Sequence, residues 1–432
     1  DDVESRGLGD VYKRQIFVYI VKKEEDIMKK FNKVLSVVVA SAMVMAMAGC
    51  GNTDNGSAAT GTNAATESAA ADNGAASGSV FKIGGIGPTT GGAAVYGLAV
   101  QHGAEIAVEE INAAGGINGY QVEFKFQDDE ADAEKSVNAY NALKDWGAQI
   151  IDGSTTSGAC IAVTDKTKED NMFQITPSGS AVECVQYDNN FRVCFSNPNQ
   201  GLASAQYIGE NGLAEKIAVI YDSSDVYSSG IYEKFVKEAE NQPFEVVAAE
   251  AFTADNKTDF SVQLQKAKDA GADMVFLPIY YQESALILTQ AAAMGYAPKW
   301  FSCDGMDGIL GGVDNFDVSL TEGVMLLTPF AADATDDLTQ SFVTKYKEKY
   351  GETPNQFAAD SYDAIYVIKA AIEKSGVTPD MSVSDICDGM KAAMTEITVD
   401  GLTGNGMTWT ADGEANKAPK AVVIENGAYK AM

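Results

Sequence analysis

Residues 150–180 read IIDGSTTSGACIAVTDKTKEDNMFQITPSGS and contain one pattern twice. In each copy a short apolar run ends in a turn rich in hydroxyl groups, at residues 154–158 and again at residues 177–180. Ligands of open α/β sheets bind beyond the carboxyl ends of the strands, and hydroxyls beside free helix N–H groups suit an anion such as a carboxylate. Because Ser, Thr and Gly are also common caps and turn residues, the alternative is a purely structural role for both turns.

The same alternation of apolar runs and helical stretches extends in both directions from these turns. We expect a first series with strands at residues 81–86 and 120–126, a strand beginning at Ile150 and another at residues 173–176, and helices at 95–113 and 133–146. A second series has expected strands at residues 217–221, 246–252, 274–277 and 299–303, and helices at 231–240, 260–270 and 283–294. Such alternation predicts parallel strands joined by right-handed crossovers, with helices on both faces of each sheet. The predicted fold class is therefore α/β, with two Rossmann-like lobes.

The chain changes character after the second series. Two helices are expected at residues 338–350 and 356–374, followed by short strands with Gly-rich turns at residues 400–425. The helical pair has to pack somewhere, and we expect it to return to the first lobe, so that the chain crosses between lobes about three times. The predicted first lobe is residues 80–198 plus 331–396, and the predicted second lobe is residues 199–330 plus 397–432.

The first 79 residues predict export and anchoring. Lysines precede the apolar run 34–47, and a small-residue cleavage site follows it, as in a signal peptide. The run is too short to span a bilayer as a helix. The end of this segment resembles a lipoprotein lipobox, which implies cleavage before Cys50 and lipidation of its thiol. We interpret residues 1–27 as a non-native leader (the alternative is a cytoplasmic segment before a retained anchor), 28–49 as the signal peptide, and 50–79 as the lipidated cysteine with a flexible tether.

Charge and cysteine content narrow the class of partner. The formal net charge of −30 disfavours nucleic acid and anionic lipid surfaces as partners. The cysteines form no Cys-x-x-Cys pair and have no histidine-rich neighbour, so no zinc site is expected. A local disulfide between Cys184 and Cys194 stays open outside the cell. Besides Cys50, the cysteines are Cys160, Cys184, Cys194, Cys303 and Cys387.

The parts that an enzyme needs are missing from the sequence. His102 is the one histidine, and no G-x-S-x-G elbow accompanies it, which argues against a serine hydrolase. Gly87 and Gly92 have the spacing of a phosphate-binding loop, but Ala93 stands where lysine is required. We therefore expect no catalytic residue, no cofactor and no metal.

Five stretches in order resemble type I periplasmic binding proteins, specifically the leucine/isoleucine/valine-binding proteins of ABC transporters. They are FKIGGIGPTTGGAAVYG (81–97), EEINAAGGINGYQVEFKFQDDEAD (109–132), ITPSGS (175–180), IAVIYDSSDVYSSG (217–230) and GLTGNGMTW (401–409). The resemblance covers residues 80–432. It implies a two-lobed Venus flytrap that binds an amino acid between its lobes and delivers it to a permease, as a monomer anchored outside the cytoplasm by a lipid.

The resemblance also implies the ligand contacts. The ligand carboxylate would meet Thr156 and Ser157 at the first turn, and its ammonium would meet Ser178, Ser180 and the acidic side chain of Asp304. Three tyrosines would line the cleft rim: Tyr96, Tyr227 and Tyr280. An ammonium buried without an anion loses its hydration, so an acid opposite the carboxylate site makes physical sense. The alternatives are that Asp304 is a turn residue before Gly305, and that either Tyr280 or its neighbour Tyr281 belongs to the core.

Other functions stay open at this stage. Leucine, isoleucine and valine are the default ligands, and related proteins that take amides, urea or aromatic acids mostly need no ammonium partner. A sensory receptor module would have the same fold with a different partner. A secreted hydrolase is disfavoured by the missing histidine and elbow. Some family members also have a disulfide near the first binding turn, but Glu130, Ala131 and Thr155 occupy that neighbourhood here.

Overall fold

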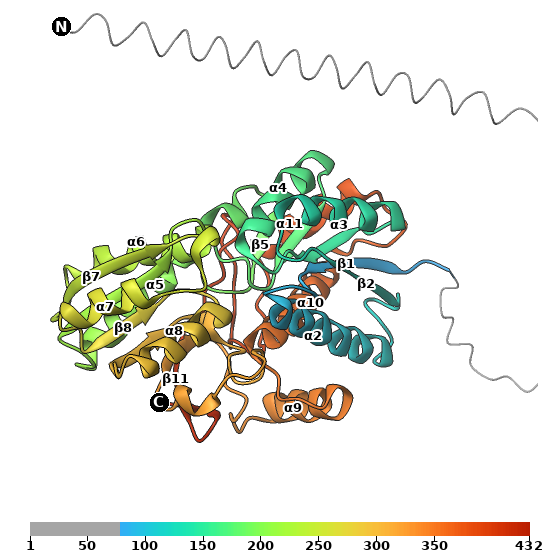
Figure 1. The fold of residues 1–432 in the computed structure, drawn as a ribbon. Helices are drawn as coiled ribbons and strands as arrows, with labels where there is room; N and C mark the ends of the chain where they lie inside the picture. The colour runs from blue at the N-terminus through green and yellow to red at the C-terminus, as the bar shows by residue number, and fades with distance from the viewer. Residues whose placement is uncertain (1–77) are drawn as a thin grey trace, which may run out of the picture. The chain divides into compact units, whose positions relative to one another are not determined.

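The computed structural model describes residues 78–432, which form two α/β lobes (Figure 1). The predicted leader, the signal peptide, Cys50 and residues 51–77 of the tether lie outside the described residues. Within residues 78–432, no helix is both long enough and apolar enough to cross a membrane.

The first lobe is built on a five-stranded sheet in which all strands are parallel. Its strand order is β2-β1-β3-β4-β5, with β1 (Phe81–Gly87), β2 (Val122–Asp128), β3 (Ile150–Gly153), β4 (Phe173–Thr176) and β5 (Asn190–Arg192). The helices α2 (Ala94–Ala113), α3 (Ala133–Trp146) and α4 (Ser157–Asp170) connect the first four strands. Every residue of β3 and β4 is buried, as expected for central strands covered on both faces. The sequence pattern missed β5, because it is short and has polar residues at both ends.

The second lobe has a seven-stranded sheet in the order β12-β11-β10-β9-β8-β6-β7. Five strands are parallel: β6 (Lys216–Asp222), β7 (Glu245–Phe252), β8 (Met274–Leu277), β9 (Lys299–Ser302) and β10 (Met325–Thr328). The last two, β11 (Lys420–Glu425) and β12 (Ala428–Ala431), form an antiparallel hairpin at the sheet edge. Asn426 and Gly427 both have positive φ at its turn, the conformation that closes a tight hairpin. The covering helices are α5 (Asn197–Glu210), α6 (Val226–Ala239), α7 (Ser261–Asp269) and α8 (Tyr281–Ala293).

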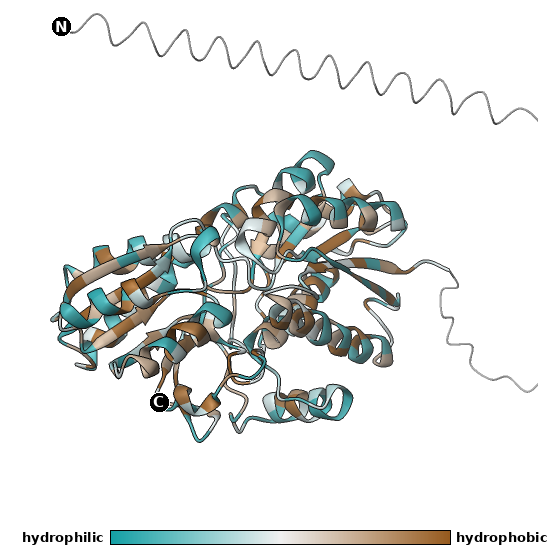
Figure 2. Cartoon of the chain, viewed as in Figure 1, coloured by the Kyte–Doolittle hydropathy of each residue, from teal (hydrophilic) through white to brown (hydrophobic). Residues whose placement is uncertain are grey.

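Three further helices follow the second sheet and lie on the first lobe (Figure 1). They are α9 (Asp337–Tyr350), α10 (Gln356–Ser375) and α11 (Val383–Met394). Helix α10 packs against α2, while α11 contacts α10 and β4. Figure 2 shows hydrophobic residues concentrated along the strands and the inner helix faces. The chain therefore crosses between lobes after β5, after β10 and before β11.

The segment before β11 lies on a different lobe from the one expected from the sequence. Residues 399–415 contain isolated bridges, and they contact the first lobe instead of the second. The backbone N–H groups of Leu402 and Thr403 donate to Asp363 on α10, and the Arg192 N–H donates to the Gly413 carbonyl. Only the hairpin at the end of the predicted 397–432 segment joins the second sheet.

Candidate ligand-binding site

One cavity between the lobes brings together all eight residues predicted to contact a ligand. Its lining is Tyr96, Thr155, Thr156, Ser157, Ser178, Ser180, Tyr227, Tyr280, Asp304, Gly305 and Phe357. The cavity is nearly filled by these side chains: it holds about 20 Å³, room for about one water molecule, so a larger ligand requires the lobes or side chains to move apart. Larger cavities also lie in the described part of the chain. One, beside α2 and residues 307–312, is lined by none of the eight residues. Another is lined in part by Thr156, Tyr227 and Tyr280 and so adjoins the predicted site.

The first turn leaves polar groups free at the start of α4. Thr156 is the N-cap residue, yet its side chain accepts no capping hydrogen bond. The Thr156 Oγ1 atom is buried and has no hydrogen-bond partner among residues 78–432. A buried unpaired hydroxyl is costly, and the helix start adds free N–H donors and a positive dipole end. This arrangement is suited to an anionic group such as a carboxylate.

The second turn is hydrogen-bonded directly to the first. The Ser178 hydroxyl donates to the Thr155 carbonyl over 2.6 Å. The Ser157 hydroxyl accepts from the backbone N–H groups of Ser180 and Ala181, each at 3.1 Å. The hydroxyls of Ser157 and Ser178 therefore hold the two turns together. The main-chain carbonyls and the Thr156 hydroxyl are the groups better placed to contact a ligand.

The Arg192 side chain donates hydrogen bonds to backbone carbonyls of the second turn, a role that was not predicted from the sequence. This side chain on β5 is fully buried and donates to the carbonyls of Ser180 at 2.6 Å and Ala181 at 2.8 Å. Its Nε lies 3.4 Å from a carboxylate oxygen of Glu414. The only signal in the sequence was a lone arginine within the otherwise apolar stretch FRVCF.

Asp304 faces the cavity from the second lobe, at the start of the short 3-10 helix η3 (Asp304–Met306). Its carboxylate accepts hydrogen bonds from the Tyr227 hydroxyl at 2.6 Å and from the Gln200 side-chain amide at 2.8 Å. Burial raises the pKa of Asp304 to about 6, and these two hydrogen bonds oppose the shift. Both partners are neutral donors, so a ligand ammonium would be the charge that balances the carboxylate.

Aromatic side chains close the cavity. The rings of Tyr227 and Tyr280 stack with their centres 5.1 Å apart, and those of Tyr96 and Phe357 lie 4.3 Å apart. The Tyr96 hydroxyl donates to the Gly305 carbonyl and so links the lobes. Burial raises the pKa of each of these tyrosines well above its usual value, which keeps the hydroxyls protonated as donors. Of the adjacent pair, Tyr280 lines the cavity and Tyr281 lies in the hydrophobic core.

The cysteines and the histidine lie in structural surroundings. All five cysteines in the described part of the chain are buried and unpaired, so the disulfide that the sequence left open between Cys184 and Cys194 is not formed. Within residues 78–432, no group of three or more His, Cys, Asp or Glu side chains is arranged to hold a metal ion. His102 stacks on Tyr350, with ring centres 3.7 Å apart, and does not line the cavity.

A family model described as periplasmic binding protein matches residues 80–428. The chain belongs to this family. Its members are the substrate-binding proteins of ABC transporters, not enzymes, and they act outside the cytoplasm. The non-enzymatic function predicted from the sequence is therefore confirmed by family membership.

Curated relatives narrow the position of this binding protein within the family. The chain is 31% identical to Leu/Ile/Val-binding protein homolog 3 of Brucella melitensis, over 69% of this chain and 80% of the relative. It is 30% identical to the leucine-, isoleucine-, valine-, threonine- and alanine-binding protein of Pseudomonas aeruginosa, over 68% of this chain and 79% of the relative. The predicted resemblance to the branched-chain amino acid group is confirmed.

Solved structures confirm the two-lobed fold. The branched-chain amino acid transporter substrate-binding protein LivJ from Streptococcus pneumoniae, in complex with isoleucine, has a TM-score of 0.73 and 28% identity, over 82% of this chain and 99% of that chain. The leucine-binding protein LivK from Thermotoga maritima has a TM-score of 0.72 and 27% identity, over 82% and 98%. A solute-binding protein from R. palustris in complex with benzoate, with a TM-score of 0.72 and 20% identity over 82% and 95%, shares the fold alone.

Proposed function

We propose that this binding protein takes up a small aliphatic amino acid between its lobes and delivers it to the permease of an ABC importer. The observation that carries the proposal is the polarity of the cavity. An unpaired hydroxyl and a helix start lie on the first lobe, and a buried carboxylate lies on the second. A zwitterion satisfies both ends. The isoleucine complex of LivJ and the names of the curated relatives support the same ligand class.

The ligand would favour closure because it contacts both lobes only when they approach each other. A ligand shifts a conformational equilibrium by its difference in affinity for the two states. We propose that Thr156 and the start of α4 bind the carboxylate, while Asp304 with the Ser178 carbonyl and Ser180 binds the ammonium. A short aliphatic side chain would pack against Tyr96, Tyr280 and Phe357, which line the cavity.

The test uses leucine together with two matched analogues. At 100 times its dissociation constant, a ligand adds about 2.7 kcal/mol to the free energy of unfolding, which a thermal shift assay detects. We expect leucine, isoleucine or valine to stabilise the protein. We expect little effect from 4-methylpentanoate, which lacks the ammonium of leucine, or from 3-methylbutylamine, which lacks the carboxylate. Stabilisation by benzoate or by the plain acid instead would favour an aromatic or simple acid ligand.

Ligand affinity is expected to depend on pH through Asp304. The ammonium needs the charged carboxylate, so below the Asp304 pKa of about 6 a proton must leave on binding. The dissociation constant should then rise about tenfold per unit of pH decrease. Titration calorimetry with leucine measures the dissociation constant at pH values between about 4.5 and 8, a range that brackets the Asp304 pKa of about 6. Asp307 and Asp360 also have raised pKa values, so the profile of Asp304→Asn is the control that isolates the Asp304 contribution.

The same raised pKa has the opposite effect on the stability of the ligand-free protein. The folded Asp304 carboxyl binds its proton more tightly than an unfolded aspartate, whose pKa is about 3.9. The stability that this proton contributes is fully present below the unfolded pKa and is lost as pH rises through about 6. Acidification therefore weakens ligand binding without a matching loss of stability from this group.

Anchoring and assembly are part of the proposal. We propose that Cys50 is lipidated and holds the protein, as a monomer, on the outer side of the cell membrane. The support is the signal-like sequence before Cys50 and the extracytoplasmic location of the family. Labelled palmitate added to growing cells should be incorporated into the wild-type protein and not into Cys50→Ser. Absence of label from the wild-type protein would contradict lipid anchoring.

A further inference from the structure

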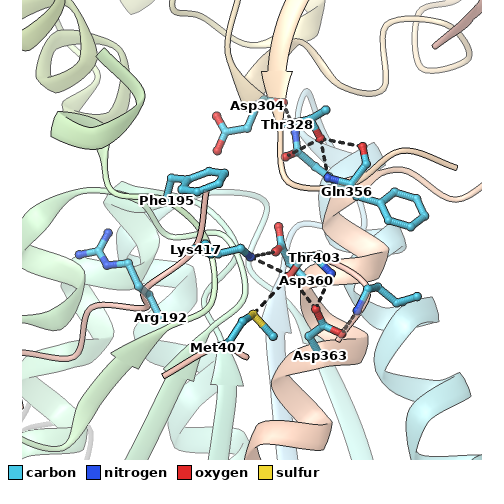
Figure 3. Close-up of polar contacts among 12 residues, drawn as sticks. Arg192, Phe195, Asp304, Thr328, Gln356, Asp360, Asp363, Thr403, Met407 and Lys417 are labelled. Atoms are coloured by element: carbon cyan, nitrogen blue, oxygen red, sulfur yellow. Dashed lines mark hydrogen bonds and ion pairs between the residues drawn. The ribbon is translucent and has the colours of Figure 1, made fainter. Parts of the chain in front are cut away.

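A buried polar cluster lies where the segments that connect the lobes meet (Figure 3). At its centre is Lys417, whose Nζ lies 3.0 Å from Asp360 Oδ1 on α10. The two side chains are 1% and 3% exposed. The same ammonium donates to the Thr403 hydroxyl at 2.7 Å. This is a buried ion pair outside the ligand cavity, since neither partner lines it.

Two of the three segments that connect the lobes contribute to this cluster. The three segments that cross between the lobes are called the first, second and third crossovers in chain order. Lys417 precedes β11 and so belongs to the third crossover. Its ammonium lies 5.5 Å from the centre of the Phe195 ring on the first crossover, between β5 and α5. The Thr403 hydroxyl donates in turn to Asp363 at 2.6 Å and so holds the segment before the third crossover to α10. The Lys417 ammonium therefore contacts the first crossover and α10, while its own residue belongs to the third crossover.

The beginning of α10 connects this cluster to the ligand cavity. Gln356, the first residue of α10, donates from its side chain to the Asp304 carbonyl at 3.0 Å. The Thr328 hydroxyl at the second crossover lies 3.3 Å from the Gln356 side-chain oxygen, as Figure 3 shows. Gln356 and Asp360 are four residues apart and lie on the same face of the helix. A short chain of contacts thus runs from Lys417 through one turn of α10 to the backbone of Asp304.

We propose that the Lys417–Asp360 ion pair is a positioning element that fixes the hinge geometry in which Asp304 meets the ligand. The inference rests on the proposed amino-acid binding. Buried ion pairs contribute little net stability compared with apolar replacements, yet they restrict geometry when every partner is satisfied. A cation shared by two crossovers and α10 is placed to define the angle between the lobes.

The test removes both charges together, because a single removal would leave a buried unpaired charge. In Lys417→Met with Asp360→Asn, we expect a melting temperature close to wild type and a dissociation constant for leucine raised about tenfold, as the binding-competent geometry becomes less populated. Small-angle X-ray scattering should show less compaction on addition of leucine. The matched control is Lys369→Met with Glu373→Gln, which removes a partly exposed pair on the same helix and should leave binding unchanged.

A second, milder variant guards against loss of folding. Thr403→Val keeps the side-chain volume but removes the hydroxyl to which Lys417 donates, and we expect about a threefold weaker affinity for leucine. Lys417→Arg retains the charge and should restore most of the affinity lost in the double variant. Wild-type affinity and compaction in the folded double variant, or wild-type affinity in Thr403→Val, would overturn the proposal.

Failure of the proposed amino-acid binding can be distinguished from failure of the positioning role. If wild-type protein binds none of the amino acids, the proposed function fails. Scattering of the ligand-free proteins still compares the hinge of the double variant with that of the control. A changed interlobe geometry in the double variant alone supports the positioning role, and identical scattering curves contradict it.

Discussion

Replacement of Asp304 with alanine is expected to weaken amino-acid binding by about 2–5 kcal/mol, because the ligand ammonium would stay buried without an anion. Asp304 is 6% exposed as a residue, so water cannot replace the lost charge at low cost. Isothermal titration calorimetry with leucine measures the change. Asp304→Asn keeps the side-chain volume and should lose nearly as much affinity, because the charge is what matters.

The matched control is Asp307→Asn. Asp307 is a second buried aspartate three residues further on, and it accepts from the Gln356 backbone N–H at 2.9 Å without lining the cavity. We expect its replacement to change leucine affinity far less than the replacement of Asp304. Unchanged affinity in a folded Asp304→Ala protein would reject the assignment of the ammonium site. An equal loss in both variants would point to general disruption of η3.

Replacement of Arg192 with methionine should lower the free energy of unfolding by about 3 kcal/mol or more, since charged hydrogen bonds contribute about 1.5–3 kcal/mol each. The guanidinium donates to the carbonyls of Ser180 and Ala181, and methionine leaves both without that donor. Leucine affinity should fall as well, because Ser180 belongs to the second binding turn. Urea unfolding and calorimetry measure the two effects.

Two comparison variants test whether the effect of Arg192→Met depends on the guanidinium group and on its burial. Arg192→Lys keeps the charge but lacks the planar fork that reaches two carbonyls, so we expect only partial recovery of stability. Lys168→Met removes a lysine that pairs with Asp188 on the surface, where both side chains are about half exposed, and should change stability by less than about 1 kcal/mol. Wild-type stability of Arg192→Met would show that the turn does not depend on this side chain.

Three of the eight predicted cavity residues share a local signal. Thr156, Ser178 and Asp304 each follow a strand closely, and the carboxyl ends of parallel strands meet at one edge of a sheet. The periodicity that predicts strands therefore also indicates which side chains gather at the cleft. The tyrosines came from the family resemblance, and the structure resolves the choice between Tyr280 and Tyr281 in favour of Tyr280 as the lining residue.

Other parts of the site had no such signal. Phe357 looks like an ordinary apolar residue of α10, and it reaches the cavity only because that helix returns to the first lobe with its beginning at the cleft. Residues 399–415 were expected in the second lobe, but Asp363 on α10 accepts hydrogen bonds from the backbone N–H groups of Leu402 and Thr403 within this segment. Strand β5 is too short for a recognisable period, so Arg192 could not be placed under the second turn.

The sequence by itself determined the order of strands and helices, the two hydroxyl-rich turns and the family, because periodicity, capping and motifs are local along the chain. Only the tertiary structure decided which distant groups pair. Gln200 contacts Asp304 across 104 positions, and Lys417 contacts Asp360 across 57. Such contacts follow from how the lobes and crossovers pack, and no spacing in the sequence encodes them. The charge that a ligand would meet and the hinge that would present it are therefore properties of the folded molecule.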